Sequence, residues 1–329
     1  MSPGSRPEPV QAAQPSGLQR ATAFAPASIG NVAIGFDILG LSVDALGDRV
    51  TVSRRSQPGV AITAIRGVAE DLPLEAERNT AGRALLAMLE ALAHSGLHPG
   101  FGFEMEIEKG IPLGSGLGGS AASAVGAVVA ANALLPQPYS KLDLLKFAMQ
   151  GEKVASGSLH VDNIAPSLFG GLVLTVGIDH PRVKQIPVPP GIKSVIVHPH
   201  MFLSTRQARG ILKRTVELSD FVWQTANLAG FISGCYTNDL DMIRASFQDV
   251  VIEPQRQALI PGFNAVRQAA MDAGALGCSI SGAGPTMFAW AQAEHADSVL
   301  ATMRREFGRQ SMAIDEWIVE AQSVGAYVL

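Results

Sequence analysis

The chain has 329 residues, 47% of them hydrophobic and 16% charged, which is enough apolar material for one large or two moderate cores. A formal net charge of −4 argues against a general binder of nucleic acid or of membrane surfaces. The two cysteines, Cys235 and Cys278, are too few for a disulfide framework and favour a reducing compartment, with the cytoplasm as the default.

The start of the chain differs in composition from the rest. Residues 1–20 are rich in Pro, Gln, Ser and Ala and contain no continuous apolar run. They match neither a signal peptide nor a membrane span, so we expect a disordered leader. The longest apolar stretch elsewhere, residues 121–135, is shorter than the ~20 residues that a membrane-crossing helix needs.

Strands and one helix are predicted before residue 100. A glycine-punctuated loop over residues 27–40 follows a first short strand, and Asn31 and Asp37 are its polar side chains that could reach a ligand. Turn capping, which Asn and Asp perform routinely, explains them equally well. The patterns predict strands over 22–26, 41–45, 50–54 and 60–65, and a helix from 79 to about 96.

A glycine-rich segment at residues 110–123 joins two strongly patterned elements. Apolar and glutamate side chains alternate over 101–108, as in a half-buried strand, and a helix of small apolar residues is predicted over 121–135. A glycine-rich turn between strand and helix places backbone N–H groups at the positive end of the helix dipole. Such a turn is an anion site, and most simply a phosphate site.

Three other interpretations of this segment fit less well. A flexible linker is not expected between an amphipathic strand and a long apolar helix. A P-loop would need lysine where Ser120 stands. Gly114, Gly116 and Gly119 do spell the dinucleotide fingerprint. The glutamate stripe before them and the missing acidic residue about 20 positions later argue against it.

After this segment, a leucine-rich helix is predicted from Ser140 and carries Glu152 near its end. A single carboxylate is usually a solvated surface group, so Glu152 alone carries little functional weight. A strand is predicted over 171–176. The proline-rich residues 181–190 are predicted to be a connector, where we place a domain boundary.

The second half alternates helices with short strands. Ser204 or Thr205 could cap a helix that carries Arg206 and Arg209, whose side chains are either solvated charges or binding groups for an anion. The patterns predict strands over 194–198 and from 317, helices over 216–231, 239–249, 262–273 and 294–307, and a hairpin over 274–288. Antiparallel-type strands with helices between them favour an α+β fold over a doubly wound α/β sheet.

Three glycine motifs, in this order, resemble the GHMP kinase superfamily over nearly the whole chain after the leader. They are Pro26-Ala-Ser with Asn31 and Gly-Phe-Asp37, residues 112–123, and Ser281-Gly-Ala-Gly-Pro285. The resemblance implies an ATP-binding domain of the ribosomal-S5-domain-2-like type over 21–185 and a ferredoxin-like α/β sandwich over 186–329. It also implies ATP and Mg²⁺ as cofactors and a homodimer.

Within the superfamily, residues 35–40, 160–166, 204–209 and 253–262 are most similar to the members that phosphorylate L-homoserine. The resemblance therefore implies this small-molecule substrate and a place in threonine biosynthesis. Two hypotheses compete: a kinase of another small molecule, such as mevalonate or a sugar, and a catalytically silent ligand sensor. An arginine pair that could clamp a carboxylate argues against the first, and the retained magnesium ligands against the second.

The same resemblance implies roles for individual residues. The cofactor-binding set is Asn79, which would contact adenine, and Pro112, Leu113, Gly114, Ser115, Gly116, Leu117, Gly118, Gly119 and Ser120, which would hold the triphosphate. Ser120 and Glu152 would bind Mg²⁺ directly or through water. The substrate-binding set is Asn31, Asp37, Asn163, Arg209 and Arg256.

Arg209 and Arg256 would clamp the substrate carboxylate, and the other three residues would hold its amino and hydroxyl ends. The implied catalytic set is Asp37, Ser120, Glu152 and Thr205, with Thr205 near the transferring phosphoryl group. Asp37 would orient the hydroxyl, or alternatively act as general base. The chain departs from the family pattern in residues 31–35, where Asn-Leu-Gly is common, and at Gly119, where serine is common.

Overall fold

The computed structural model describes residues 17–96, 100–156 and 161–329. Most of the predicted leader, residues 1–16, lies outside these residues, as does residue 160 of the 160–166 stretch. Arg20, which we had assigned to the leader, already begins the first strand.

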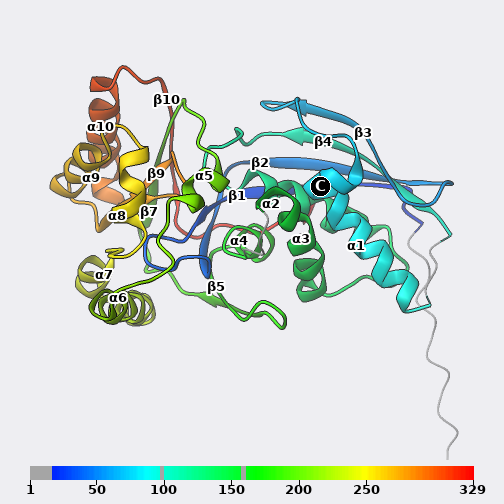
Figure 1. The fold of residues 1–329 in the computed structure, drawn as a ribbon, viewed down its shortest axis with the longest axis horizontal. Coiled ribbons are helices and arrows are strands. Elements are labelled where there is room, and N and C mark those ends of the chain that lie inside the picture. Colours follow the sequence, from blue (N-terminus) through cyan, green and yellow to red (C-terminus); the bar gives the residue numbers. More distant parts are fainter. Residues whose placement is uncertain (1–16, 97–99, 157–160) are drawn as a thin grey trace, which may run out of the picture.

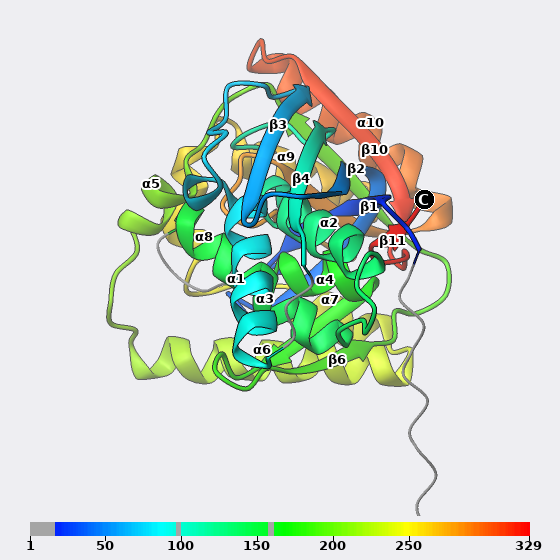
Figure 2. The ribbon, with the colours of Figure 1, turned by 90° about the vertical axis from the view of Figure 1, so that its right-hand side faces the viewer.

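Among the described residues, one sheet has seven strands in the order β11-β1-β2-β4-β3, with β5 paired to β2 and β6 paired to β5. The strands are β1 (Arg20–Gly30), β2 (Leu39–Arg55), β3 (Val60–Gly67), β4 (Gly102–Lys109), β5 (Leu172–Val176), β6 (Arg182–Ile186) and β11 (Tyr327–Val328). The β3–β4 pair is parallel and the others are antiparallel. The last strand of the chain therefore lies beside the first (Figure 2).

Helices cover one face of this sheet (Figure 1). They are α1 (Thr80–His94), preceded by the 3₁₀ turn η1 (Ala76–Arg78), then α2 (Gly119–Ala133), α3 (Lys141–Ser156) and α4 (Ile164–Phe169). α2 is buried along most of its length, because its small side chains let it approach β1 and β2 closely. The alternation predicted over 101–108 is confirmed, with the glutamates of β4 exposed and its apolar residues buried.

A second sheet of four antiparallel strands, in the order β10-β7-β9-β8, is found in the described C-terminal part. Its strands are β7 (Ile192–Pro199), β8 (Gly277–Ile280), β9 (Met287–Gln292) and β10 (Ile314–Glu320). The helices of this part are α5 (Thr205–Gly210), α6 (Leu218–Thr237), α7 (Leu240–Ser246), α8 (Glu253–Arg256), the 3₁₀ turn η2 (Gln257–Leu259), α9 (Phe263–Asp272) and α10 (Ala293–Arg309). α9 and α10 pack on the second sheet and enclose a core of their own.

The two sheets and their helices confirm the predicted α+β class. Three local predictions are wrong. The strands predicted over 41–45 and 50–54 form the single strand β2. The loop predicted over 27–40 begins as a strand, because β1 continues past a register shift at Pro26/Ala27. The predicted connector over 181–190 contains β6, which β5 holds as an edge strand.

No helix among the described residues has both the length and the apolar character that a membrane crossing requires.

Candidate active site

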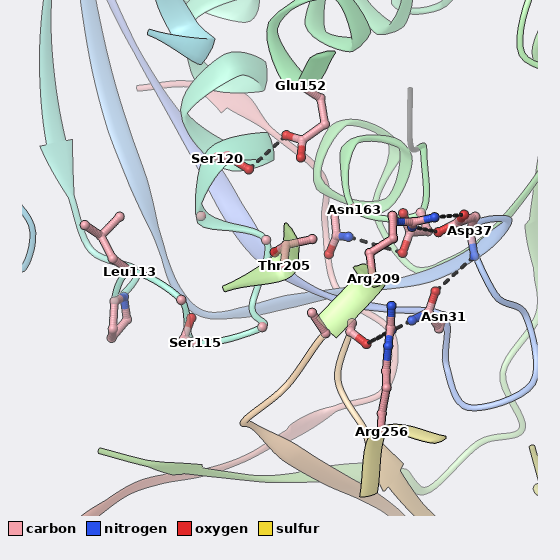
Figure 3. Close-up of a pocket in the computed structure, with 18 residues that line it drawn as sticks. Asn31, Asp37, Leu113, Ser115, Ser120, Glu152, Asn163, Thr205, Arg209 and Arg256 are labelled. Carbon is pink, nitrogen blue, oxygen red and sulfur yellow. Dashed lines mark hydrogen bonds and ion pairs between the residues drawn. The ribbon is translucent and has the colours of Figure 1, made fainter. Parts of the chain in front are cut away.

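A single cavity collects nearly all of the predicted site residues (Figure 3). Its lining comprises Asn31, Asp37, Pro112, Leu113, Gly114, Ser115, Gly116, Gly118, Gly119, Ser120, Glu152, Asp162, Asn163, Thr205, Arg209, Arg256, Gly282 and Ala283. Two predicted residues are not part of it. Leu117 is buried in the core, and Asn79 caps α1, where its side-chain oxygen accepts from the N–H groups of Ala81 and Gly82.

The glycine-rich loop is shaped by backbone that only glycine adopts readily. Gly114, Gly116 and Gly118 have φ values of 63°, 80° and 71°. Neighbouring segments hold the loop through its carbonyl groups. Ser281 Oγ donates to Gly116 O at 2.7 Å, and Ser28 N donates to Leu117 O at 3.1 Å. No side chain caps the N-terminus of α2. Its first N–H groups are therefore suited to an anion.

A buried polar network, which we did not foresee from the sequence, anchors this loop from behind. Lys109, at the end of β4, forms an ion pair with Asp48 and donates to Gly119 O at 2.7 Å and to Ser123 Oγ at 2.8 Å. Asp48 also accepts from Gly110 N at 3.0 Å. The network fixes both ends of the loop, because it joins its first residue to the first turn of α2.

The two predicted magnesium ligands lie together at the edge of the cavity. Ser120, in the first turn of α2, donates through Oγ to Glu152 Oε2 of α3 at 2.8 Å (Figure 3). A hydroxyl and a carboxylate are the hard oxygen ligands that suit Mg²⁺. The described residues contain no cluster of three His, Cys, Asp or Glu side chains that could hold a metal. Mg²⁺ beside a nucleotide needs only one or two carboxylates, since phosphates and water complete its shell.

The opposite side of the cavity is made of charged side chains that pair with one another. Arg209 of α5 holds both oxygens of Asp37, at 3.1 and 2.7 Å, in a bidentate ion pair. Asn31 Oδ1 accepts from Asp37 N at 3.0 Å, and Asn31 Nδ2 donates to Gly282 O at 3.0 Å. Both Asn31 and Asp37 have positive φ, so this loop holds a backbone conformation that non-glycine residues rarely adopt.

Arg256 is buried beside this pair. Its Nε donates to Ala208 O at 3.1 Å and its Nη1 to Gly282 O at 3.0 Å. Burial, followed by the neighbouring Arg209, lowers the pKa of Arg256. The ring of Phe36 lies against both guanidinium groups. Its centroid is 5.1 Å from Cζ of Arg209 and 5.3 Å from Cζ of Arg256.

α8, which carries Arg256, is held by two carboxylates. Asp249 accepts from three backbone N–H groups at its start, at 2.8 to 3.0 Å. Glu253 accepts from Ser279 and forms an ion pair with Arg267 at 3.5 Å, and burial raises its pKa from 4.5 to about 7.

Asn163 also lines the cavity, at the start of α4. Its Oδ1 accepts from Ser28 Oγ at 3.0 Å, and its Nδ2 donates to Asp162 Oδ2 at 3.2 Å. Asp162 and the pair Gly282 and Ala283 also line the cavity, but our site prediction did not include them. Asp162 lies within the 160–166 stretch, and Gly282 and Ala283 lie within the third glycine motif. Membership of these two motifs is the sequence signal that could have identified all three residues.

Comparison with known proteins agrees with this geometry. The chain matches the family of GHMP kinases N terminal domain over residues 79–171 and that of GHMP kinases C terminal over residues 231–310. It is 50% identical to a homoserine kinase of Xylella fastidiosa (strain M12), with 94% of each chain covered. It is 49% identical to a homoserine kinase of Xanthomonas campestris pv. campestris (strain B100), with 95% of each covered.

A solved homoserine kinase structure, from Cytophaga hutchinsonii, superimposes with a TM-score of 0.89 at 43% sequence identity. The match covers 95% of this chain and 98% of that one. The family resemblance read from the three glycine motifs is thus confirmed over both sheets, and ATP is the cosubstrate that a kinase of this family uses. The chain belongs to the homoserine kinase family within the GHMP kinases.

Proposed function

We propose that this protein transfers the γ-phosphoryl group of ATP to the side-chain hydroxyl of L-homoserine. The hydroxyl oxygen forms a bond to the γ-phosphorus, the bond from that phosphorus to the bridging oxygen of ADP breaks, and the hydroxyl proton is released. The single observation that carries the proposal is one cavity with an uncapped helix N-terminus on one side and two arginines on the other. The names of the relatives support L-homoserine as the substrate.

On the nucleotide side, we propose that backbone N–H groups from Gly114 to Ser120 hold the phosphates. Ser120 and Glu152 would hold Mg²⁺, which spreads the charge that develops on the transferring group. Thr205 lines the same cavity at the start of α5 and would contact the transferring phosphoryl group. The whole arrangement favours positioning and charge neutralisation, which phosphoryl transfer needs more than a strong base.

On the substrate side, we propose that Arg209 and Arg256 bind the carboxylate of homoserine. Asp37 already pairs with Arg209, so its carboxylate lies beside the proposed carboxylate clamp. The ammonium group of homoserine is attached to the same carbon as the carboxylate. This position therefore favours Asp37 as the partner of the ammonium group, with the hydroxyl left to Asn163. Orientation of the hydroxyl by Asp37 is the alternative.

An ADP-release assay tests the proposed reaction. ATP and Mg²⁺ are supplied with L-homoserine, L-threonine, L-serine, mevalonate or galactose in turn. Selective turnover of L-homoserine that EDTA abolishes is expected. Turnover of another alcohol would keep the kinase chemistry and reject the substrate, while ATP binding without any turnover would favour a ligand sensor.

We also propose a homodimer that works in the cytoplasm. Exposed apolar side chains of α6, among them Leu218, Val222 and Trp223, support an association surface. Both cysteines are free and buried, as in proteins of a reducing compartment. Light scattering across a concentration series would test the dimer, and a mass that stays monomeric throughout would reject it.

A further inference from the structure

A second cavity, of about 720 Å³, lies behind the wall of the proposed active site. Its volume is within the ~300–1,000 Å³ typical of small-molecule sites. Its lining comprises Ile34, Phe36, Ile38, Arg206, Arg209, Gly210, Leu212, Lys213, Arg214, Val216, Phe221, Gln224, Thr225, Leu228, Val251 and Ile252. In Figure 2, the segment from α5 to α6 that contributes to it descends along the left edge of the molecule.

The charges around this cavity all have one sign. Every charged residue in its lining is a lysine or an arginine. Arg206, Lys213 and Arg214 form no ion pair with a carboxylate in the part of the chain that the structure describes. Aliphatic and aromatic side chains from the 31–38 loop, residues 212–216, α6 and residues 251–252 supply most of the remaining wall, together with the polar Gln224 and Thr225. An apolar body with an anionic end group complements such a site.

The second cavity shares its walls with the first. The loop over 31–38 places Asp37 in the active-site cavity and Phe36 in the second one. α5 places Thr205 in the first and Arg206 in the second, and Arg209 lines both. A ligand in the second cavity would therefore contact the elements that hold the proposed substrate clamp.

A hydrogen bond reinforces this coupling. Gln224 of α6 donates to Ile34 O at 3.0 Å and accepts from Val250 N at 2.9 Å. Gln224, which lines the second cavity, thereby joins the loop over 31–38 to the segment that leads into α8. Any displacement of α6 by a ligand would be transmitted to both.

We propose that the second cavity is a regulatory site for an amphipathic anion, such as a medium-chain carboxylate, that weakens substrate binding. The anionic group would draw Arg209 away from Asp37 while the apolar body packs between Phe36 and Leu228. The two sites are then linked by a coupling free energy, so each ligand lowers the affinity for the other. The effect on substrate rests on the proposed function, whereas binding of the anion does not.

Isothermal titration calorimetry with octanoate, octylammonium and 1-octanol tests the site itself. We expect saturable octanoate binding that is at least tenfold weaker in the variant Lys213→Glu/Arg214→Glu, and no comparable binding of octylammonium. The matched control Arg182→Glu/Lys184→Glu reverses two exposed charges of β6 and should bind octanoate like the parent chain. Equal binding of all three probes, or equal octanoate binding by both double variants, would overturn the proposal.

Steady-state kinetics with octanoate test the coupling. We expect a homoserine KM at least threefold higher with kcat nearly unchanged, and loss of this effect in Lys213→Glu/Arg214→Glu. Octanoate binding without a change in KM would overturn the regulatory role, and absence of homoserine turnover would leave the calorimetric test valid. Absence of saturable octanoate binding would by itself overturn the proposal. If Phe221→Asp then also dissociated a dimer, the cavity would be assigned to a second copy of the chain.

Discussion

The glycine-rich loop and the arginine side of the cavity are held by different means. The loop is fixed by its own backbone conformation and by a buried lysine behind it, so it can present N–H groups before any ligand arrives. The arginine side consists of Asp37, Arg209 and Arg256, which come from three distant segments. Arg209 forms an ion pair with Asp37, and the charges of both act on Arg256. If the proposed sites are correct, a phosphate enters a preformed cradle, whereas the substrate must exchange partners with an existing ion pair.

Removing the carboxylate of the two proposed metal ligands should produce the largest effect. We expect Glu152→Gln to lower kcat about 1,000-fold and to raise the Mg²⁺ concentration needed for half-maximal rate, because charge on the transferring group is no longer balanced. Initial rates across a Mg²⁺ series measure both quantities. Glu104→Gln, on the exposed face of β4, is the control, and an unchanged Mg²⁺ response of Glu152→Gln would exclude Glu152 from the metal site.

Asp37→Asn sharpens the assignment on the substrate side. A partner of the ammonium group loses a charged hydrogen bond, so the homoserine KM should rise up to about 100-fold while kcat changes little. Kinetics at saturating ATP separate the two parameters. A large fall in kcat at unchanged KM would instead identify Asp37 as the group that orients or deprotonates the hydroxyl.

The anchoring of α8 should make stability depend on pH. The folded chain holds a proton on Glu253 more tightly than the unfolded chain, since the pKa rises from 4.5 to about 7. The stabilisation is therefore present below pH ~4.5 and is lost as the pH rises through ~7, by about 3 kcal/mol in total. Urea unfolding of the parent chain and of Glu253→Gln measures the slope. An equally steep decline in Glu253→Gln would refute the assignment.

The preformed loop predicts a smaller effect for Gly116→Ala. An added Cβ would lie 2.5 Å from Ser281 O and 2.7 Å from Gly284 O, at a φ of +80°. We expect the KM for ATP to rise about tenfold, because the loop must open to accept the methyl group. Gly59→Ala is the matched control, with a φ of +85° and no atom within 4 Å. Equal effects of the two substitutions on ATP would show that the loop is not a preformed cradle.

The sequence carries different amounts of information about the two regions. The loop could be predicted, because its glycines, strand and helix are contiguous and each follows a local rule. The substrate side came from family resemblance, since Asn31, Asn163 and Arg256 are unremarkable polar residues until the fold joins them. The pairing of Arg209 with Asp37 and the burial of Lys109 depend on tertiary packing, and no local sequence pattern indicates them.

The pairings of two edge strands of the seven-stranded sheet were also missed from the sequence. Edge strand β6 lies in the proline-rich residues 181–190, whose composition predicts a connector. The pairing of β11 with β1 joins residues at opposite ends of the sequence. The partner of β11 lies outside any local window, whereas β6 pairs with the nearby β5 and was missed because the prolines around it favour a connector. The alternating β4 and the small-residue helix α2 were predictable, because their burial follows the sequence period.

The carboxylate clamp is the central claim about the substrate side, and one comparison tests it directly. Values of kcat/KM are measured for L-homoserine and for 3-aminopropan-1-ol, which lacks only the carboxylate, with the parent chain, Arg209→Ala and Arg256→Ala. We expect the parent chain to prefer L-homoserine by more than about 100-fold, and each variant to lose most of that preference, since each arginine donates charged hydrogen bonds to the carboxylate. Variants that keep the full preference would contradict the clamp.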